Sequence, residues 1–314
     1  MGMPSVVRKK PLLQRARNTF SREGELWLIS ILALAFLFLF SFLPMLGNYI
    51  GFVKYKPGAP IFSAKWVGLK YIQDFFSLPD VWNVIRNTLV MGSLNITVGF
   101  AAPILLALLF NELRNGPMKR VVQTVSYLPH FVSWVVVASI AFSLLSSEGL
   151  LNEVLLNLGF ITKPIDYINN GKGYWLMITL MNIWKSVGWG SIIYISAITG
   201  IDQELYQAGA VDGLGRFGMV WHITLPGIAT TIAMLFILGA GNIINGGFEQ
   251  HLLLGTALTR EYYETIDTYV YRYGLELGRL SFATSVGFLK GLVAIALLVI
   301  TNTIVKKTTD NAIY

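Results

Sequence analysis

Long stretches without charged side chains divide this sequence. Four of them contain no Asp, Glu, Lys or Arg, and they run from Glu25 to Lys54, Arg86 to Glu112, Arg120 to Glu148 and Arg216 to Glu249. Two more, Lys172 to Asp202 and Arg279 to Lys306, are each interrupted by one lysine, Lys185 or Lys290. A helix needs about 20 mainly apolar residues to cross the hydrocarbon core of a membrane, and each stretch holds at least that many. The pattern predicts six transmembrane spans.

The predicted spans are Leu26–Leu46, Thr88–Phe110, Val122–Leu145, Tyr174–Ala197, Leu225–Gly246 and Phe282–Val305. We expect helices because an open sheet leaves backbone groups unsatisfied in lipid. The apolar runs also lack the two-residue alternation of an outer-membrane barrel. The predicted fold class is an all-α membrane protein with six transmembrane helices.

Composition supports this class. Of the 314 residues, 54% are hydrophobic and 13% are charged, whereas a soluble domain carries about 25% charged residues. Mean hydropathy is +0.59. Six apolar windows in one soluble domain would leave little to face water, so we set aside a large globular protein.

Basic residues near the span ends predict the orientation, because they accumulate on the cytoplasmic side. The longer outer loops also contain basic residues, together with most of the acids: Lys54, Lys56, Lys65, Lys70, Arg260, Arg272 and Arg279. The groups that indicate the cytoplasmic side are Arg8, Lys9, Lys10, Arg15, Arg17 and Arg22 before the first span, Arg114, Lys119 and Arg120 after the second, and Lys306 and Lys307 after the last. With six crossings all lie on one side, which places both termini in the cytoplasm. The predicted divisions are a cytoplasmic segment 1–25, a transmembrane domain 26–305 and a cytoplasmic tail 306–314.

Lipid contacts account for the basic excess. Within Pro11–Phe20, four apolar residues predict one face of a short interfacial helix: Leu12, Leu13, Ala16 and Phe20. The net charge of +7 needs no nucleic-acid partner, because anionic headgroups attract the inner basic residues.

The segment Gly200–Pro226, between the fourth and fifth spans, is rich in small residues. Asp202 is a plausible N-cap, with Glu204 in the first turn. Ala208, Gly209, Asp212 and Gly213 share one helical face, which permits close approach by another surface. Gly213 suits the left-handed end of such a helix, and Pro226 suits the first turn of the next. These features alone describe a short connecting helix.

The spacing in this segment resembles the signature loop of binding-protein-dependent ABC importer permeases, which reads Glu-Ala-Ala, then Gly, then Ile-x-Leu-Pro. The matching positions here are Tyr206, Gln207, Ala208, Gly209, Asp212, Gly213, Ile223, Leu225 and Pro226. The sequence departs from the pattern at Gln203 for a frequent Pro, Gln207 for Glu, Gly209 for the second Ala and Leu214 for a common Ala. Trp66–Ile72, Ile266–Arg272 and Phe282–Phe288 are similar to permeases for complex sugars.

The resemblance implies a type I ABC importer permease in the bacterial cytoplasmic membrane, without catalytic residues of its own. It implies a second permease subunit, two cytoplasmic ATPases that bind ATP and Mg²⁺, and an extracytoplasmic solute-binding protein. The coupling loop 200–224 would seat a helix on an ATPase. The implied cargo is an oligosaccharide or polysaccharide, with another solute as the alternative. Gln207 is compatible with a related but different permease partner that keeps the Glu.

Polar residues within the spans are candidates for the translocation path. Lys185 either faces a water-filled path or a partner, or pairs with backbone carbonyls. Asn182, Trp184 and Trp189 offer hydrogen bonds and stacking surfaces to a sugar, although packing also explains the tryptophans. The other candidates are Asn242 and Asn245, in a glycine-rich stretch that suits a gate or close packing, and Lys290 in the last span.

Other function classes lack their motifs. Gly213–Gly218 matches G-x-G-x-x-G but does not follow a strand, and no G-x-x-x-x-G-K-[ST] loop occurs. His130, His222 and His251 lack metal-ligand spacing, and the chain has no cysteine, so we expect no metal site. A secondary transporter needs coupling carboxylates inside its spans, and all six windows lack Asp and Glu.

Overall fold

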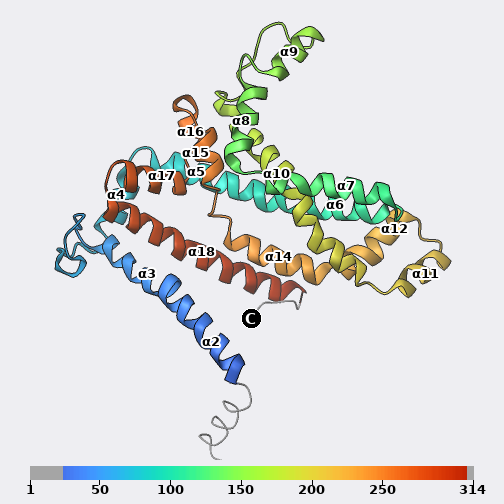
Figure 1. Ribbon diagram of the computed structural model, residues 1–314, viewed down its shortest axis with the longest axis horizontal. Helices are drawn as coiled ribbons and strands as arrows, with labels where there is room; N and C mark the ends of the chain where they lie inside the picture. Colours follow the sequence, from blue (N-terminus) through green and yellow to red (C-terminus); the bar gives the residue numbers. More distant parts are fainter. Residues whose placement is uncertain (1–23, 310–314) are drawn as a thin grey trace, which may run out of the picture.

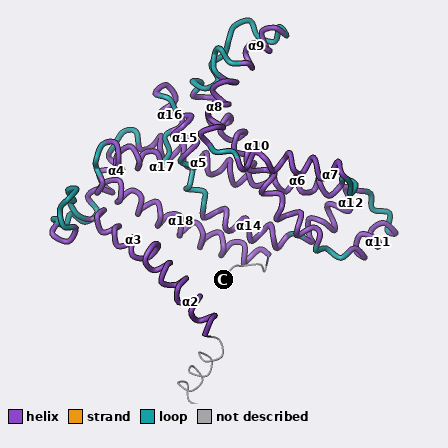
Figure 2. Tube along the Cα trace, in the orientation of Figure 1, coloured by secondary structure: helices purple, strands orange, loops and turns teal. Residues whose placement is uncertain are grey.

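The computed structural model describes residues 24–309, and its regular structure is helical (Figure 1). Figure 2 shows helices joined by loops. Within the described range, the extended pairing is limited to an isolated antiparallel bridge between Val53 and Trp66. The predicted all-helical fold is confirmed. The interfacial helix predicted within Pro11–Phe20 lies outside the described residues.

The helices follow one another in this order. They are α2 (Gly24–Leu37), η1 (Phe38–Phe42), α3 (Leu43–Met45), η2 (Leu46–Phe52), η3 (Ile61–Ser63), α4 (Lys70–Ser77), α5 (Val81–Leu94), η4 (Asn95–Gly99), α6 (Phe100–Glu112), α7 (Pro117–Tyr127), η5 (Leu128–Phe131), α8 (Trp134–Leu145), α9 (Leu150–Asn157), α10 (Gly171–Thr199), α11 (Gln203–Val211), α12 (Arg216–Met219), η6 (Val220–Thr224), α13 (Leu225–Gly227), α14 (Ala229–Gly241), α15 (Glu249–Leu254), η7 (Ala257–Thr259), α16 (Arg260–Tyr263), α17 (Ile266–Tyr271), η8 (Arg272–Glu276) and α18 (Leu280–Thr309). Segments η1, η4, η6 and η8 are π-helical, and η2, η3, η5 and η7 are 3₁₀-helical.

Four helical segments within residues 24–309 are long and apolar enough to cross a membrane. They are Gly24–Phe52, Val81–Glu112, Trp134–Asn157 and Leu280–Lys307. A fifth consists of Arg216–Gly227 and Ala229–Gly241, which meet at an angle of 62°. Helix α10 has 29 residues but is outside this set. Three tryptophans, two tyrosines, two lysines and four glycines lower its mean hydropathy.

The third predicted span, Val122–Leu145, is not one continuous helix. Helix α7 passes into η5, and the backbone is extended at Val132 and Ser133 before α8 begins. The Ser133 side chain accepts a hydrogen bond from the Val136 N–H (3.4 Å), so it caps α8. The prediction of an uninterrupted span was wrong because it relied on the absence of charge and overlooked the signals of Pro129 and Ser133.

The fifth and sixth predicted spans have different ends in the structure. Helix α14 ends at Gly241 instead of Gly246, and Asn242 is its C-cap. The last helix, α18, continues to Thr309, beyond the predicted end at Val305. Two glycines followed by Asn242 weaken the end of α14 in the manner of a helix stop signal.

Helices α6, α7 and α10 run side by side, and α14 lies beside α18 (Figure 1). Helices α8 and α9 project from this bundle, and α2 diverges from it. Core packing is divided among three clusters along the bundle. The first centres on Phe75, Tyr269 and Phe282, the second on Met91, Tyr174 and Leu254, and the third on Ala107, Tyr194 and Ile228.

Helices α16 and α17 are fastened to α5, and α15 contacts α8, at the end of the bundle opposite α11 (Figure 1). The buried Asn87 side chain donates to the carbonyls of Glu261 (2.9 Å) and Glu264 (3.0 Å). Arg272 donates to both carboxylate oxygens of Glu264, at 2.6 and 2.9 Å, and contacts Asp80 at 3.3 Å. These bonds anchor the chain that follows α14.

Candidate functional site

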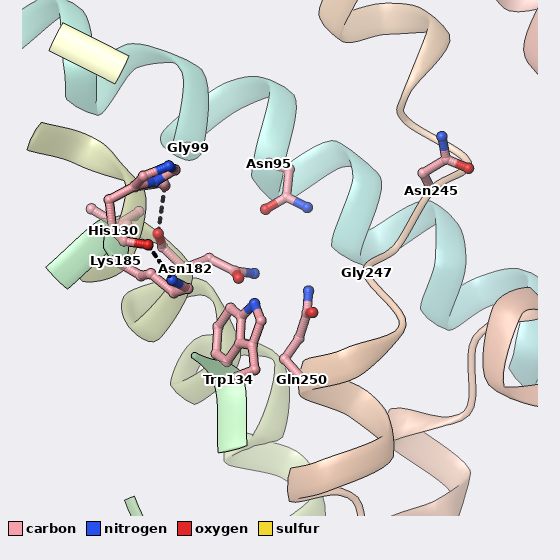
Figure 3. Close-up of a pocket in the computed structure, with 11 residues that line it drawn as sticks. Asn95, Gly99, His130, Trp134, Asn182, Lys185, Asn245, Gly247 and Gln250 are labelled. Carbon is pink, nitrogen blue, oxygen red and sulfur yellow. Dashed lines mark hydrogen bonds between the residues drawn. The ribbon is translucent and has the colours of Figure 1, made fainter. Parts of the chain in front are cut away.

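A polar pocket opens where the break between α7 and α8 faces α10 and the segment after α14. Its volume is about 430 Å³, and its lining residues are Asn95, Gly99, His130, Trp134, Asn182, Ile183, Lys185, Ser186, Asn245, Gly247 and Gln250. Figure 3 shows Asn95, Asn182 and Gln250 directed toward a common space, with Trp134 at its edge. Four amide side chains line it, and an amide both donates and accepts hydrogen bonds. The lining therefore suits a hydroxyl-rich ligand.

Local backbone irregularities bring these groups together. Asn95 and Gly99 bound the π-helix η4, which interrupts the helix between α5 and α6. Asn182, Lys185 and Ser186 share one face of α10, at the spacing of helical neighbours. Gly247 has a φ of +89°, in the left-handed region that favours glycine, as the chain turns from α14 toward α15.

Lys185 is fixed by the broken helix opposite. Its ammonium donates to the carbonyl of His130 (2.7 Å), which Figure 3 shows beside it, and to that of Val132 (2.6 Å), both at the break before α8. The ammonium also lies 5.9 Å from the centroid of the Trp134 ring. The structure therefore combines the two alternatives for Lys185, because the side chain pairs with backbone carbonyls and also lines the pocket.

The predicted path residues do not all meet in this pocket. Asn182, Lys185 and Asn245 line it, and Asn245 donates to the Asn242 side chain (2.9 Å). The Trp189 ring stacks on His130, with 4.8 Å between their centroids, and neither Trp189 nor Trp184 is a lining residue. Lys290 forms an ion pair with Asp267 and lines a separate, mainly apolar cavity of about 220 Å³.

Several lining residues were not predicted. Asn95 is a polar residue inside an apolar stretch, a signal the sequence contained. His130, Trp134 and Gln250 had no comparable signal, because only the fold brings their segments to α10.

Buried His251 of α15 holds the pocket-lining turn against α10. Its Nε2–H donates to the Gly246 carbonyl (2.9 Å), which can only accept. Nδ1 is therefore unprotonated and accepts a hydrogen bond from the Tyr174 hydroxyl (3.0 Å). Burial lowers the pKa of His251 to about 4, although the bond to Gly246 opposes this shift. The ring is thus neutral at physiological pH.

The segment predicted to couple to an ATPase forms a short helix at the other end of the bundle (Figure 1). The Asp202 carboxylate accepts from the Glu204 N–H (2.9 Å), which confirms the expected N-cap. Gly213 ends α11 with a φ of +79°, also as expected. The Leu214 N–H donates to Gly209 O (2.9 Å) and the Gly213 N–H to Ala210 O (3.2 Å), the two bonds of a Schellman motif.

The small residues of α11 do not share one role. Gly209 is buried, and a Cβ there would lie 2.8 Å from Ile223 and 3.2 Å from Leu214. The departures from the signature at Gly209 and Leu214 are therefore spatially linked, since the larger Leu214 occupies room that a second Ala would need. The Tyr206 hydroxyl lies 3.0 Å from the Thr224 hydroxyl, so α11 is fastened to the following helix.

The uncovered face of this segment includes residues that the spacing did not indicate. Gln207, Ala208, Asp212 and Gly213 are exposed, as is Pro226. Val211 is 88% and Phe217 92% exposed, and both are apolar. Large apolar side chains in a loop of small and polar residues are the signal that could have identified them. Ile223 and Leu225 are partly buried.

A family model described as the binding-protein-dependent transport system inner membrane component matches residues 96–309. The chain belongs to this family of ABC transporter permeases, as the signature-loop resemblance predicted.

Two relatives from Bacillus subtilis (strain 168) match over most of their length. Protein LplB is 40% identical over 294 residues, which cover 93% of this chain and 92% of LplB. The polygalacturonan/rhamnogalacturonan transport system permease protein YteP is 40% identical over 314 residues, covering 100% of this chain and 97% of YteP.

A crystal structure of a bacterial ABC transporter involved in the import of the acidic polysaccharide alginate contains a similar chain. The TM-score is 0.86 and the identity 32%, over 94% of this chain and 99% of that one. The same values hold for the alginate transporter in complex with alginate pentasaccharide-bound periplasmic protein.

Proposed function

We propose that this permease crosses the bacterial cytoplasmic membrane six times, with both termini in the cytoplasm. Helix α10 adds the crossing that brings the count from five to six, and it is the fourth along the chain. Its 29 residues extend roughly 44 Å at about 1.5 Å per residue, longer than a hydrocarbon core of about 30 Å. The basic residues before the first span and after the last favour this orientation. The divisions 1–25, 26–305 and 306–314 follow from it.

The proposed cargo is an oligosaccharide or polysaccharide delivered by an external solute-binding protein. The names of YteP and of the alginate transporter support this cargo class. The pocket supports it chemically, because four amides and the Trp134 ring provide hydrogen bonds and a flat apolar surface. Saccharide sites combine such groups, since sugars present hydroxyls at their edges and apolar C–H faces.

The proposed coupling runs through the 202–226 loop to two cytoplasmic ATPases, which bind ATP and Mg²⁺ and perform hydrolysis. A second permease chain, related but different, completes the translocation path. The observation that carries this proposal is the coupling loop at the end of the bundle. Its helix α11 is fastened through Tyr206 and Gly209 and exposes Val211, and the following α12 exposes Phe217. Such apolar groups on a rigid support are suited to a pocket on a partner protein.

The test is ATP hydrolysis by the purified transporter with saccharide-loaded binding protein as the stimulant. We expect Val211→Asp to reduce the stimulation by loaded binding protein at least tenfold, because a carboxylate would be buried at the ATPase contact. Val211→Thr, which keeps the shape, should retain most of it. Gly213→Asp should also uncouple, since its positive φ strains a side chain.

The control is whether each variant still purifies together with the ATPases. If both charged variants purify with the ATPases and keep full stimulation, α11 is not the coupling contact. Loss of the ATPases from the purified variant would instead support the contact directly.

A further inference from the structure

The charge of the cargo can be inferred from the pocket, and this inference rests on the import function proposed above. Lys185 is the single charged side chain among the lining residues, and no Asp or Glu is among them. We propose that Lys185 binds carboxylates of the passing glycan, so that this permease selects acidic over neutral saccharides.

The ammonium of Lys185 is positioned without being neutralised. The carbonyls of His130 and Val132 occupy two of its three N–H donors at 2.7 and 2.6 Å. Carbonyl oxygens orient the group but carry no formal charge, so a positive charge and one donor remain for a ligand. A charge-assisted bond to a carboxylate is roughly twice as strong as a bond between neutral groups.

The other membrane lysine provides a contrast within the same chain. Lys290 of α18 is paired with the carboxylate of Asp267 in α17, so its charge is compensated. The cavity beside it is lined mainly by apolar residues, among them Phe75, Leu89 and Val293. The chain therefore compensates one lysine with an acid and leaves the other facing amides.

The neighbours of Lys185 fit a sugar acid better than a free inorganic anion. The Trp134 ring, 5.9 Å from the ammonium, offers a face for a sugar ring. Asn95, Asn182 and Gln250 converge on the same space and can hydrogen-bond hydroxyls (Figure 3). A uronate presents a carboxylate, hydroxyls and an apolar ring face together, which matches these three kinds of group.

A purely structural role for Lys185 makes a different prediction. If the lysine only fastened the break between α7 and α8, its loss would reduce transport of every saccharide by the same factor. A lysine that binds carboxylates determines the ratio between acidic and neutral cargo.

The experiment uses the complete transporter in proteoliposomes with two probes that differ only at C6. These are an oligogalacturonide and its carboxyl-reduced, neutral counterpart. Uptake is measured for each, as is equilibrium binding to the transporter without the binding protein, so that the binding protein's own preference does not enter. We expect Lys185→Met to lower the acidic-to-neutral ratio at least tenfold, and Lys185→Arg to retain most of it.

The matched control is Lys290→Met, which should change both probes by the same factor. If Lys185→Met leaves the ratio unchanged, or lowers uptake and binding of both probes equally, Lys185 is only a structural support and this inference is overturned. If the wild-type transporter neither imports nor binds either probe, the saccharide cargo proposed above fails instead. The two failures are therefore separable.

Discussion

His251 shows how one buried side chain links the pocket turn to the bundle. Its neutral ring accepts a hydrogen bond from Tyr174 and donates one to Gly246, and a proton on Nδ1 would leave the Tyr174 O–H without this acceptor. The protonated form is disfavoured in the folded state because burial lowers the pKa to about 4. The unfolded chain takes up that proton near its ordinary pKa of about 6.5.

Stability should therefore depend on pH through this residue. The neutral His251 ring makes its full contribution to the free energy of unfolding above about pH 6.5. This contribution falls as the pH drops toward 4, by at most about 1.4 kcal/mol per pH unit. We expect the thermal midpoint of the purified transporter to fall between about pH 7 and about pH 5. His251→Gln should show a smaller fall over that interval, and an equal fall in both proteins would contradict the assignment.

At the residue scale, sequence spacing predicted the local geometry of the coupling loop well. Asp202 and Gly213 occupy the cap positions expected of them, because caps depend on neighbours within a few residues. The inward position of Gly209 was not predictable in the same way, since it depends on packing against Ile223 in the next helix.

Helices α7 and α10 meet without intervening side chains. A Cβ at Gly188 of α10 would overlap the backbone carbonyl of Ser126 in α7. One turn earlier, Lys185 bonds the carbonyls at the break that follows α7. Helix α10 therefore positions both α7 and the break between α7 and α8.

Substitution of Gly188 tests this contact. Gly188→Ala should lower the free energy of unfolding by about 2–3 kcal/mol, because backbone atoms cannot move aside as side-chain ends do. Thermal unfolding of the purified permease measures the loss. Gly291→Ala in α18 is the matched control, since a Cβ there has no neighbour within 4 Å in the described part of the chain other than the adjacent backbone of its own helix. Equal midpoints for the two variants would exclude the close contact.

At the element scale, charge-free windows located the helices but not their interruptions. The break at Val132 and Ser133 and the bend at Ile228 both occur within charge-free windows, so the absence of charge does not mark them. Such breaks are set by which backbone groups neighbouring helices can satisfy. The Lys185 ammonium satisfies two of the carbonyls at the first break, those of His130 and Val132, from 55 and 53 residues away in sequence.

The topology of the whole molecule depends on α10, the helix whose aromatic residues and glycines lower its hydropathy. If α10 crosses the membrane, the loop before it and the segment after it lie on opposite sides. If it does not cross, both lie on the same side.

Because the chain has no cysteine, single introduced cysteines can show on which side of the membrane each end of α10 lies. We expect a membrane-impermeant maleimide to label Lys163→Cys in cells whose cytoplasmic membrane is intact, and Thr199→Cys, at the end of α10, only after that membrane is permeabilised. Both positions are exposed, so reagent access is not limited by the fold. Labelling of both cysteines under the first condition would disprove the six-span topology.

At the scale of the whole molecule, composition and the signature loop predicted the class of protein, and the family match confirmed it. The pocket was only partly predictable. Asn182, Lys185 and Asn245 stood out as polar groups in apolar sequence, whereas Trp134 and Gln250 come from segments that only the tertiary fold brings to α10.

The bend at Ile228 also has a mechanical consequence. The helical segment before it has 12 residues and the one after it 13, so they extend roughly 18 and 20 Å at about 1.5 Å per residue. Buried Ile228 lies at the junction of these two helical arms, which are nearly equal in length. A displacement applied at α11 should reappear beyond α14, near Asn245, with little amplification or loss. Under the coupling proposed above, the distance by which the ATPases displace α11 would then determine, almost one to one, how far the passage near Asn245 opens.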